Sequence, residues 1–152
     1  MAEQRVIIPY SPRHQFRPYH NRTSRFAKIV AHRRFGKTVG CTNDKIKAAL
    51  KNERIDPPPR YAYVAPTYTQ AKDIAWGYLK HYSAPIPGIE KSESELWVRY
   101  PNGAQIRLYG ADNYDRMRGI YLDGVILDEP AQIDPRAWSE VIRPALSDRQ
   151  GW

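Results

Sequence analysis

The sequence predicts an α/β protein with a mainly parallel central sheet flanked by helices. Short apolar runs alternate with stretches of helical periodicity over residues 25–82, in the order strand, helix, strand, helix. A tight loop that contains Gly36 joins the first predicted strand to the first predicted helix. Because ligands of parallel α/β sheets bind at the carboxyl ends of the strands, this loop is the predicted centre of function.

The composition suits one globular domain. The chain has 152 residues, of which 41% are hydrophobic and 26% charged. No run approaches the roughly 20 apolar residues of a membrane span, and the first apolar run is too short for a secretory signal, so we expect an intracellular protein that does not engage a membrane. Cys41 is the only cysteine, which excludes an internal disulfide and a thiolate zinc site.

The net charge of +8 is concentrated at the start of the chain. Residues 1–37 hold nine Lys/Arg side chains and one acid, whereas the other 115 residues hold fifteen of each sign. The basic residues therefore cluster in sequence with the Gly36 loop. This pattern favours a polyanionic partner, either a nucleoside triphosphate or a DNA backbone, over a merely solvated surface.

The loop itself, residues 31–38, reads Ala-His-Arg-Arg-Phe-Gly-Lys-Thr and resembles a phosphate-binding loop in which Ala31 replaces the first glycine. In such a loop, backbone N–H groups and the helix N-terminus face a triphosphate. Lys37 would reach the β- and γ-phosphates, and the Thr38 hydroxyl would bind Mg²⁺. A predicted strand at 25–32 and a helix from Thr38 supply the expected context. The alternative is an ordinary strand-to-helix turn with a surface lysine.

Two adjacent carboxylates follow a predicted apolar strand at 124–127. Neighbouring residues at a strand end point to opposite sides, so Asp128 and Glu129 can have different roles. Asp128 can hold Mg²⁺ through water, while Glu129 acts as general base on the attacking water. A strand end followed by a helix cap is the alternative. Together with the phosphate-binding loop, the pair predicts an ATPase.

Three further elements are predicted after the first helix. A strand at 61–65 precedes a helix from Thr67 to Tyr82, with Thr67 and Gln70 as a capping box. Its inward stripe comprises Ala71, Ile74, Ala75, Tyr78 and Leu79. Runs at 96–100 and 104–109 form a hairpin around an Asn-Gly turn. Its Arg99 and Arg107 are predicted to be solvated, with a DNA contact as the alternative.

The ends of the chain carry the remaining predictions. Residues 9–20 contain three prolines and are expected to form an ordered loop rather than a regular helix. Gln15 could present its amide to an adenine edge while Tyr10 or Phe16 stacks on the ring; the alternative is an arm packed on the domain surface. A helix is predicted from Asp134-Pro135, ended or kinked at Pro144.

These residues resemble the ATPase domain of the large terminase subunit of tailed bacteriophages. The resemblance runs from about Tyr10 to Trp152 and rests on the loop, the 65–72 segment, the hairpin, Met117-Arg118-Gly119 and the strand that ends in the two carboxylates. It implies a P-loop NTPase of the additional-strand, catalytic-glutamate type. The chain would comprise an adenine-side arm at 1–24 and a partial ATPase domain at 25–152. In that family the first loop position is often not glycine, which accommodates Ala31.

The resemblance also implies roles for individual residues. Arg33 or Arg34 would sense the phosphate beside Phe35 and Gly36, and Gln15 with Tyr10 would read adenine. Arg118, or its neighbour Arg116, would be the arginine finger that a subunit inserts into the next subunit's site. The alternative for these arginines is a salt bridge to Asp112 or Asp115.

The implied function is ATP hydrolysis with Mg²⁺, coupled to packaging of double-stranded DNA into a procapsid. Expected partners are the portal protein and the small terminase subunit, with a homo-oligomeric ring on the portal, a monomer possible in solution, and location in the host-cell cytoplasm. The coupling motif and nuclease domain of the family are not found in the sequence, so we expect a truncated chain and assign it no DNA cleavage. A helicase-like DNA translocase is one alternative. A non-catalytic remnant that binds DNA or a terminase partner is the other.

Overall fold

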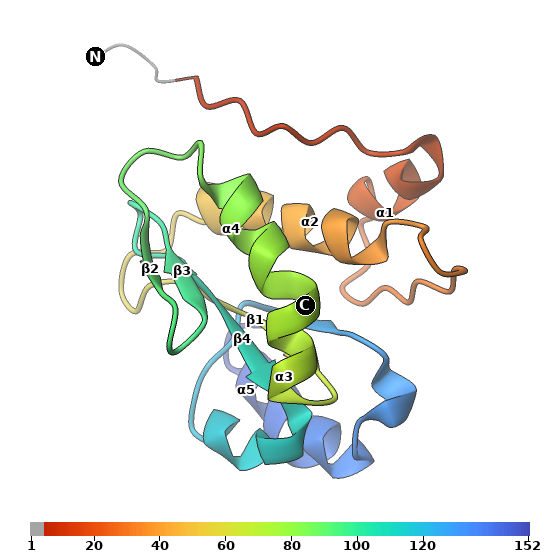
Figure 1. Cartoon of the computed structure of the whole chain (residues 1–152). Helices are drawn as coiled ribbons and strands as arrows, with labels where there is room; N and C mark the ends of the chain where they lie inside the picture. Colours follow the sequence, from red (N-terminus) through yellow and green to blue (C-terminus); the bar gives the residue numbers. More distant parts are fainter. Residues whose placement is uncertain (1–4) are drawn as a thin grey trace.

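A computed structural model describes residues 5–152, and its centre is a mixed five-stranded sheet in the order β2-β3-β4-β1-β5 (Figure 1). Strand β1 lies between β4 and β5 and is parallel to both, whereas β3 runs antiparallel to its neighbours β2 and β4. The strands are β1 (Arg60–Ala65), β2 (Glu90–Ser92), β3 (Trp97–Arg99), β4 (Gln105–Gly110) and β5 (Gly124–Leu127). The predicted α/β class with a parallel centre is confirmed.

Helices cover both faces of this sheet. One face carries α2 and a long helix made of α3, η2 and α4; the other carries η3, η5 and α5 (Figure 1). The bounds are η1 (His14–Phe16), α1 (Arg17–His20), α2 (Lys37–Lys51), α3 (Tyr68–Ala71), η2 (Lys72–Trp76), α4 (Gly77–Ser83), η3 (Ala111–Met117), η4 (Pro130–Gln132), η5 (Ala137–Ile142) and α5 (Arg143–Ser147). Among the described residues, no helix is both long and apolar enough to span a membrane.

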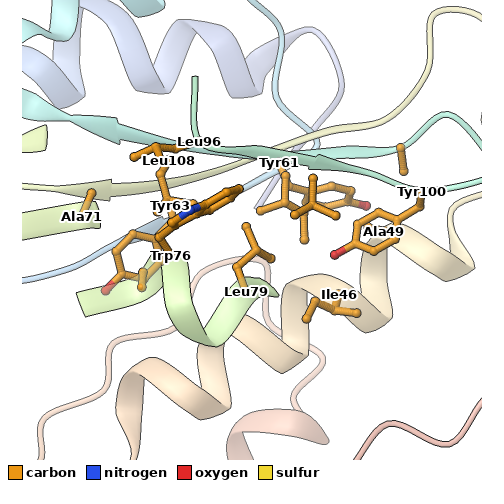
Figure 2. Close-up of a cluster of buried hydrophobic side chains, with 14 of the residues drawn as sticks. Ile46, Ala49, Tyr61, Tyr63, Ala71, Trp76, Leu79, Leu96, Tyr100 and Leu108 are labelled. Carbon is orange, nitrogen blue, oxygen red and sulfur yellow. The ribbon is translucent and has the colours of Figure 1, made fainter. Parts of the chain in front are cut away.

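Successive side chains of a strand point to opposite faces of the sheet, so the hydrophobic core is divided into two clusters, one on each face. Alternate β1 residues Tyr61 and Tyr63 pack with Ile46 of α2 and Leu79 of α4, as Figure 2 shows. The intervening Ala62 and Val64 join a second cluster against η3, η5 and α5. Strand β1 is therefore buried on both sides, and its carboxyl end lies among the elements that surround the predicted site.

The helix predicted from Thr67 is confirmed, including its capping box. The Gln70 backbone N–H donates to the Thr67 hydroxyl at 3.1 Å, and the Thr67 N–H donates to the Gln70 side chain at 3.2 Å. The predicted inward stripe is wrong in part, because Ile74 and Tyr78 are 41% and 43% exposed. A π-helical turn at Lys72–Trp76 interrupts the α-helical period and places Trp76 in the core.

The predicted hairpin is also confirmed, with Gly103 at φ +86° in its turn. The short strand β2 was not predicted. It pairs with β3, where Arg99 forms an ion pair with Glu90 at 3.4 Å. Arg107 is not freely solvated, since its Nε atom is buried without a hydrogen-bond partner. The expected solvated role is therefore wrong for Arg107.

The strand predicted at 25–32 is not formed. Phe26 and Val30 of this run are 53% and 85% exposed, and no strand is assigned there. The edge of β5 is instead contacted at its start by Trp152, whose N–H donates to Asp123 O at 3.1 Å and whose carbonyl accepts from Val125 N at 2.7 Å. An apolar run becomes a strand only where a neighbouring strand satisfies its backbone, and residues 25–32 meet none in the described chain.

Residues 9–20 contain a helical turn that was not expected. The short η1 and α1 helices lie here, with Pro18 near the start of α1, where its missing N–H costs nothing. This arm is attached to α2 by an ion pair between Arg22 and Asp44, at 2.9 Å, with both side chains largely buried. Tyr19 also donates to the Asp44 carboxylate at 3.2 Å. The first four residues of the predicted 1–24 arm lie outside the described residues.

Gly40 of α2 is in direct contact with the arm. A Cβ atom here would overlap the ring of Phe16, which is 3% exposed. We expect Gly40→Ala to lower the free energy of unfolding by about 1–3 kcal/mol through overpacking. Gly77→Ala is the matched control: nothing lies within 4 Å of its added Cβ, so helix propensity should make that variant more stable by roughly 0.5–1 kcal/mol. Urea unfolding checks both, and an unchanged Gly40→Ala would contradict the contact.

Lys45 is buried on the same helix, 2% exposed, with its Nζ 3.1 Å from the Trp152 ring centroid. Desolvation lowers the pKa of Lys45 to about 7; the Asp44 carboxylate opposes this shift, and the Arg22 charge adds to it. The unfolded chain, with an ordinary lysine pKa of roughly 10.4, therefore binds more protons above neutral pH. Stability should rise with pH in this window, because deprotonation favours the folded state.

We expect the free energy of unfolding of the wild-type chain, relative to Lys45→Met, to rise by on the order of 2 kcal/mol from about pH 6 to about pH 8.5. The comparison removes the pH dependence that comes from titratable groups present in both proteins. Urea unfolding at the two pH values measures the difference. Parallel pH profiles for the two proteins would show that Lys45 does not titrate in this range.

Candidate nucleotide site

The Gly36 loop leads directly into α2. Gly36 is the N-cap residue of that helix at φ +93°, a left-handed conformation that favours glycine, and Arg34 also has a positive φ of 62°. The Lys37 Nζ atom donates to the Ala31 carbonyl at 2.9 Å and so spans the loop. The helix N-terminus, its free N–H groups and the lysine are therefore presented together, as anion binding requires.

Arg13 of the arm braces this loop. Its Nη1 atom donates to the Arg34 carbonyl at 2.9 Å and to the Phe35 carbonyl at 3.2 Å. The sequence prediction missed this residue because only its position in a basic arm marked it, and the arm holds several other arginines. Arg13 holds the loop conformation and adds a positive charge beside it.

A cavity of about 350 Å³ lies between the arm, the loop and α2. Tyr10 lines it, with its hydroxyl 2.7 Å from His20 Nε2 and its ring edge-on to Tyr82 at 6.1 Å. Gln15 is exposed and does not line the cavity. Other lining residues are Pro9, Ser11, Arg13, Phe16, Phe35, Gly36, Val39 and Tyr82. The mostly apolar and aromatic lining beside the loop is suited to a flat ring.

The carboxylates Asp128 and Glu129 follow β5. The Tyr63 hydroxyl from neighbouring β1 donates to Asp128 Oδ2 at 2.7 Å. Burial raises the pKa of Tyr63 well above its ordinary value; Asp128 adds to the rise, and the nearby Thr38 hydroxyl opposes it. Tyr63 therefore bonds to one of the two residues predicted to hold Mg²⁺, Asp128, and lies near the other, Thr38. Sequence reasoning missed this tyrosine because it lies in the middle of a core strand.

Glu129 has a left-handed backbone, with φ 47° and ψ 57°, and its side chain is exposed. A non-glycine residue in this region is uncommon and stores strain that is characteristic of functional sites. This turn separates Glu129 from the partly buried hydrogen bond of Asp128. The two carboxylates therefore have different environments, as the prediction of different roles requires.

The predicted finger and sensor arginines lie on the surface. Arg118 is 52% exposed and bonds to Asp115 at 2.6 Å and Glu140 at 3.2 Å. The alternative of a salt bridge to Asp115 is therefore observed for Arg118. Arg116 is exposed and makes no hydrogen bond or ion pair with the described residues. Arg33 and Arg34 are exposed on the loop.

The predicted metal position is formed by oxygen donors. No group of three His, Cys, Asp or Glu side chains suited to a metal occurs within residues 5–152. Thr38 and Asp128 instead offer hard oxygen donors, and Tyr63 bonds to Asp128 with the Thr38 hydroxyl nearby. This pair fits Mg²⁺, which keeps several waters and uses few protein ligands together with substrate phosphates.

The α/β layers, the loop at the start of α2 and the acidic end of β5 define the fold of a P-loop NTPase. The chain is similar to the terminase large subunits of Thermus phage G20c and Thermus virus P23-45. Each alignment has a length of 175 with 27% identity, and it covers 96% of this chain and 33% of the relative. The chain thus spans about a third of the length of these curated relatives. No protein-family model matches it.

Solved structures agree with these relatives. The ATPase domain of the Thermus phage P74-26 large terminase superposes with a TM-score of 0.81 at 26% identity, over 95% of this chain and 64% of that one. The large terminase of another thermophilic bacteriophage, in complex with ADP, gives a TM-score of 0.61 at 16% identity, over 77% of this chain and 29% of that one, which supports the fold alone. The resemblance to large terminase ATPase domains is confirmed.

Proposed function

We propose that this chain is part of the ATPase motor of a phage terminase large subunit, with residues 1–24 as the adenine-side arm and residues 25–152 as part of the ATPase domain. The observation that supports it most is the 2.7 Å hydrogen bond from the Tyr63 hydroxyl to Asp128, with the Thr38 hydroxyl nearby. In this proposal Tyr63 lies between the phosphate-binding loop and the acidic strand end. The similarity to a solved terminase ATPase domain at a TM-score of 0.81 supports the same assignment.

The substrate is ATP, with its base in the cavity beside Tyr10 and its phosphates at the N-terminus of α2. Lys37 exchanges its bond to the Ala31 carbonyl for the β- and γ-phosphates, and the Gly36 backbone contacts them. Arg33 or Arg34 senses the γ-phosphate. Gln15 contacts adenine after a rearrangement of the arm, because it lies outside the cavity lining.

For hydrolysis, Glu129 is the general base that takes a proton from the attacking water. Mg²⁺, bound by Thr38 and through water by Asp128, would neutralise charge on the phosphates. Arg118 is the finger residue, with Arg116 as the neighbouring candidate. Because Arg118 is bonded to Asp115 and Glu140, it must exchange these partners before it reaches a neighbouring subunit's nucleotide.

ATP hydrolysis is coupled to translocation of double-stranded DNA in this proposal. The protein acts in the host-cell cytoplasm as a ring of subunits, with the portal protein and the small terminase subunit as partners. The basic segment at 1–37 supports a polyanionic partner. A helicase-like translocase would use the same nucleotide site, and a non-catalytic remnant would bind DNA or a terminase partner without it.

Titration of ATP–Mg²⁺ against the wild-type chain and Lys37→Ala tests the nucleotide site. We expect Lys37→Ala to weaken ATP binding by tenfold or more, because the lysine is a main charge on the β- and γ-phosphates. Lys51→Ala is the control, since Lys51 ends the same helix at the opposite terminus. Equal ATP affinity in all three proteins would reject the site. DNA binding that falls steeply with salt, without ATP binding, would favour the remnant.

A further inference from the structure

A second pocket, of about 220 Å³, lies on the face of the sheet opposite α2. It is formed at the amino ends of the parallel strands β1 and β4, where Arg60 and Gln105 are register partners, and by the 119–122 segment. The proposed nucleotide site is at the carboxyl ends of β1 and β5. The two sites are thus separated by the length of β1.

Two arginines with unmatched donors line this pocket. The Nε atoms of Arg60 and Arg107 are buried and have no hydrogen-bond partner. Arg60 Nη1 donates to the Gln105 side-chain carbonyl, and neither guanidinium forms an ion pair with the described residues. Folded proteins satisfy nearly all buried polar groups, and a buried charged donor without a partner is costly. Apart from the Arg60–Gln105 bond, the two guanidinium groups have no acceptor among residues 5–152.

The nearest carboxylate does not neutralise these arginines. Asp123 accepts a hydrogen bond from the Arg60 backbone N–H at 2.9 Å, but its side chain is paired with Arg149 at 3.2 Å and Arg54 at 3.7 Å. No carboxylate is present in the pocket lining drawn from residues 5–152. The amino end of the sheet consequently carries an excess of positive charge.

The size and chemistry of the pocket indicate one class of ligand. Guanidinium groups present parallel N–H donors that match phosphate oxygens. The ring of Tyr109 lies 5.3 Å from the Arg107 guanidinium, and Tyr121 lines the same space. A volume of about 220 Å³ is below the 300–1,000 Å³ or so of sites for drug-sized ligands. It suits a single phosphate group.

We propose that Arg60 and Arg107 form a binding site for one phosphate group, either of a free anion or of a nucleic-acid backbone. The site does not depend on the proposed ATPase function. Its test uses the Lys37→Ala chain, so that the loop at α2 does not take up the probe. Inorganic phosphate, pyrophosphate and a short DNA duplex are titrated separately, and the ¹⁵N-labelled arginine Nε–H signals are followed by NMR.

Arg60→Gln and Arg107→Gln should each weaken the binding of at least one of the three probes tenfold or more. Arg99→Gln, on the neighbouring strand with its guanidinium paired to Glu90, should leave binding unchanged. Arg107→Lys keeps the charge without the forked donors and should recover only part of the affinity. Circular dichroism melting confirms that each variant is folded.

Loss of phosphate and pyrophosphate binding alone would identify a free anion as the ligand. Loss of duplex binding would identify a backbone phosphate if the slope of log binding constant against log salt concentration is also reduced by about one in the variants. The proposal is overturned if Arg60→Gln and Arg107→Gln bind every probe as Arg99→Gln does. It is also overturned if the Arg60 and Arg107 Nε–H signals do not respond to any of them.

Discussion

Replacement of Glu129 by glutamine should lower the rate of ATP hydrolysis by roughly 10²–10⁴-fold while ATP affinity stays within about twofold. Glutamine keeps the shape of the side chain but cannot accept a proton from water. The exposed Glu129 carboxylate does not bond to the partly buried Tyr63–Asp128 pair, so its replacement should leave that pair intact. Single-turnover hydrolysis together with equilibrium ATP binding separates the two effects.

Glu53→Gln is the matched control, because Glu53 is an exposed carboxylate after the end of α2. It should hydrolyse ATP as the wild-type chain does. A Glu129→Gln protein that retains the wild-type rate would remove Glu129 from the proposed mechanism. A loss of rate that is matched by an equal loss of ATP affinity would instead assign the residue to binding.

Replacement of Arg22 by leucine should lower the free energy of unfolding by about 3–5 kcal/mol. The Arg22 and Asp44 side chains are 13% and 10% exposed, and two N–H···O bonds of 2.9 and 3.3 Å join them. Without Arg22, Asp44 would remain largely buried, with Tyr19 and His20 as its remaining side-chain contacts. Desolvation lowers the pKa of His20, so at neutral pH its neutral ring would not replace the lost charge.

The control for this change is Arg99→Leu, which removes an ion pair whose side chains are 42% and 69% exposed. An exposed pair contributes little, so this variant should lose less than about 1 kcal/mol. Urea unfolding near pH 7.5 compares the two. Equal losses in both variants would show that burial does not strengthen the Arg22–Asp44 pair. Because this pair attaches the arm to α2, Arg22→Leu should also weaken ATP binding.

The elements that the sequence predicted best depend on neighbouring residues alone. The capping box of Thr67 and Gln70 needs two side chains three positions apart, and the Asn102-Gly103 turn needs a residue tolerant of positive φ. The loop at Gly36 follows from similar local requirements. These elements are confirmed because their determining contacts lie within a few positions along the chain.

Predictions that required a distant partner were less accurate. The run at 25–32 has the apolar pattern of a strand, but the sheet edge beside β5 is contacted by Trp152 instead. The π-turn in η2 moved Ile74 and Tyr78 to the surface because Trp76 packs in the core. Periodicity gives the pattern of a segment but does not identify the surface that it meets.

The sequence by itself determined the α/β class, the Gly36 loop at the start of α2 and the acidic strand end, since each is encoded in a short stretch with its own chemistry. Only the tertiary structure decided that Arg13 braces the loop, that Tyr63 bonds to Asp128, and that Arg118 is paired within its own chain. These contacts join residues from separate elements or depend on the path of the backbone. Their geometry arises only when the strands and helices pack, which local sequence does not specify.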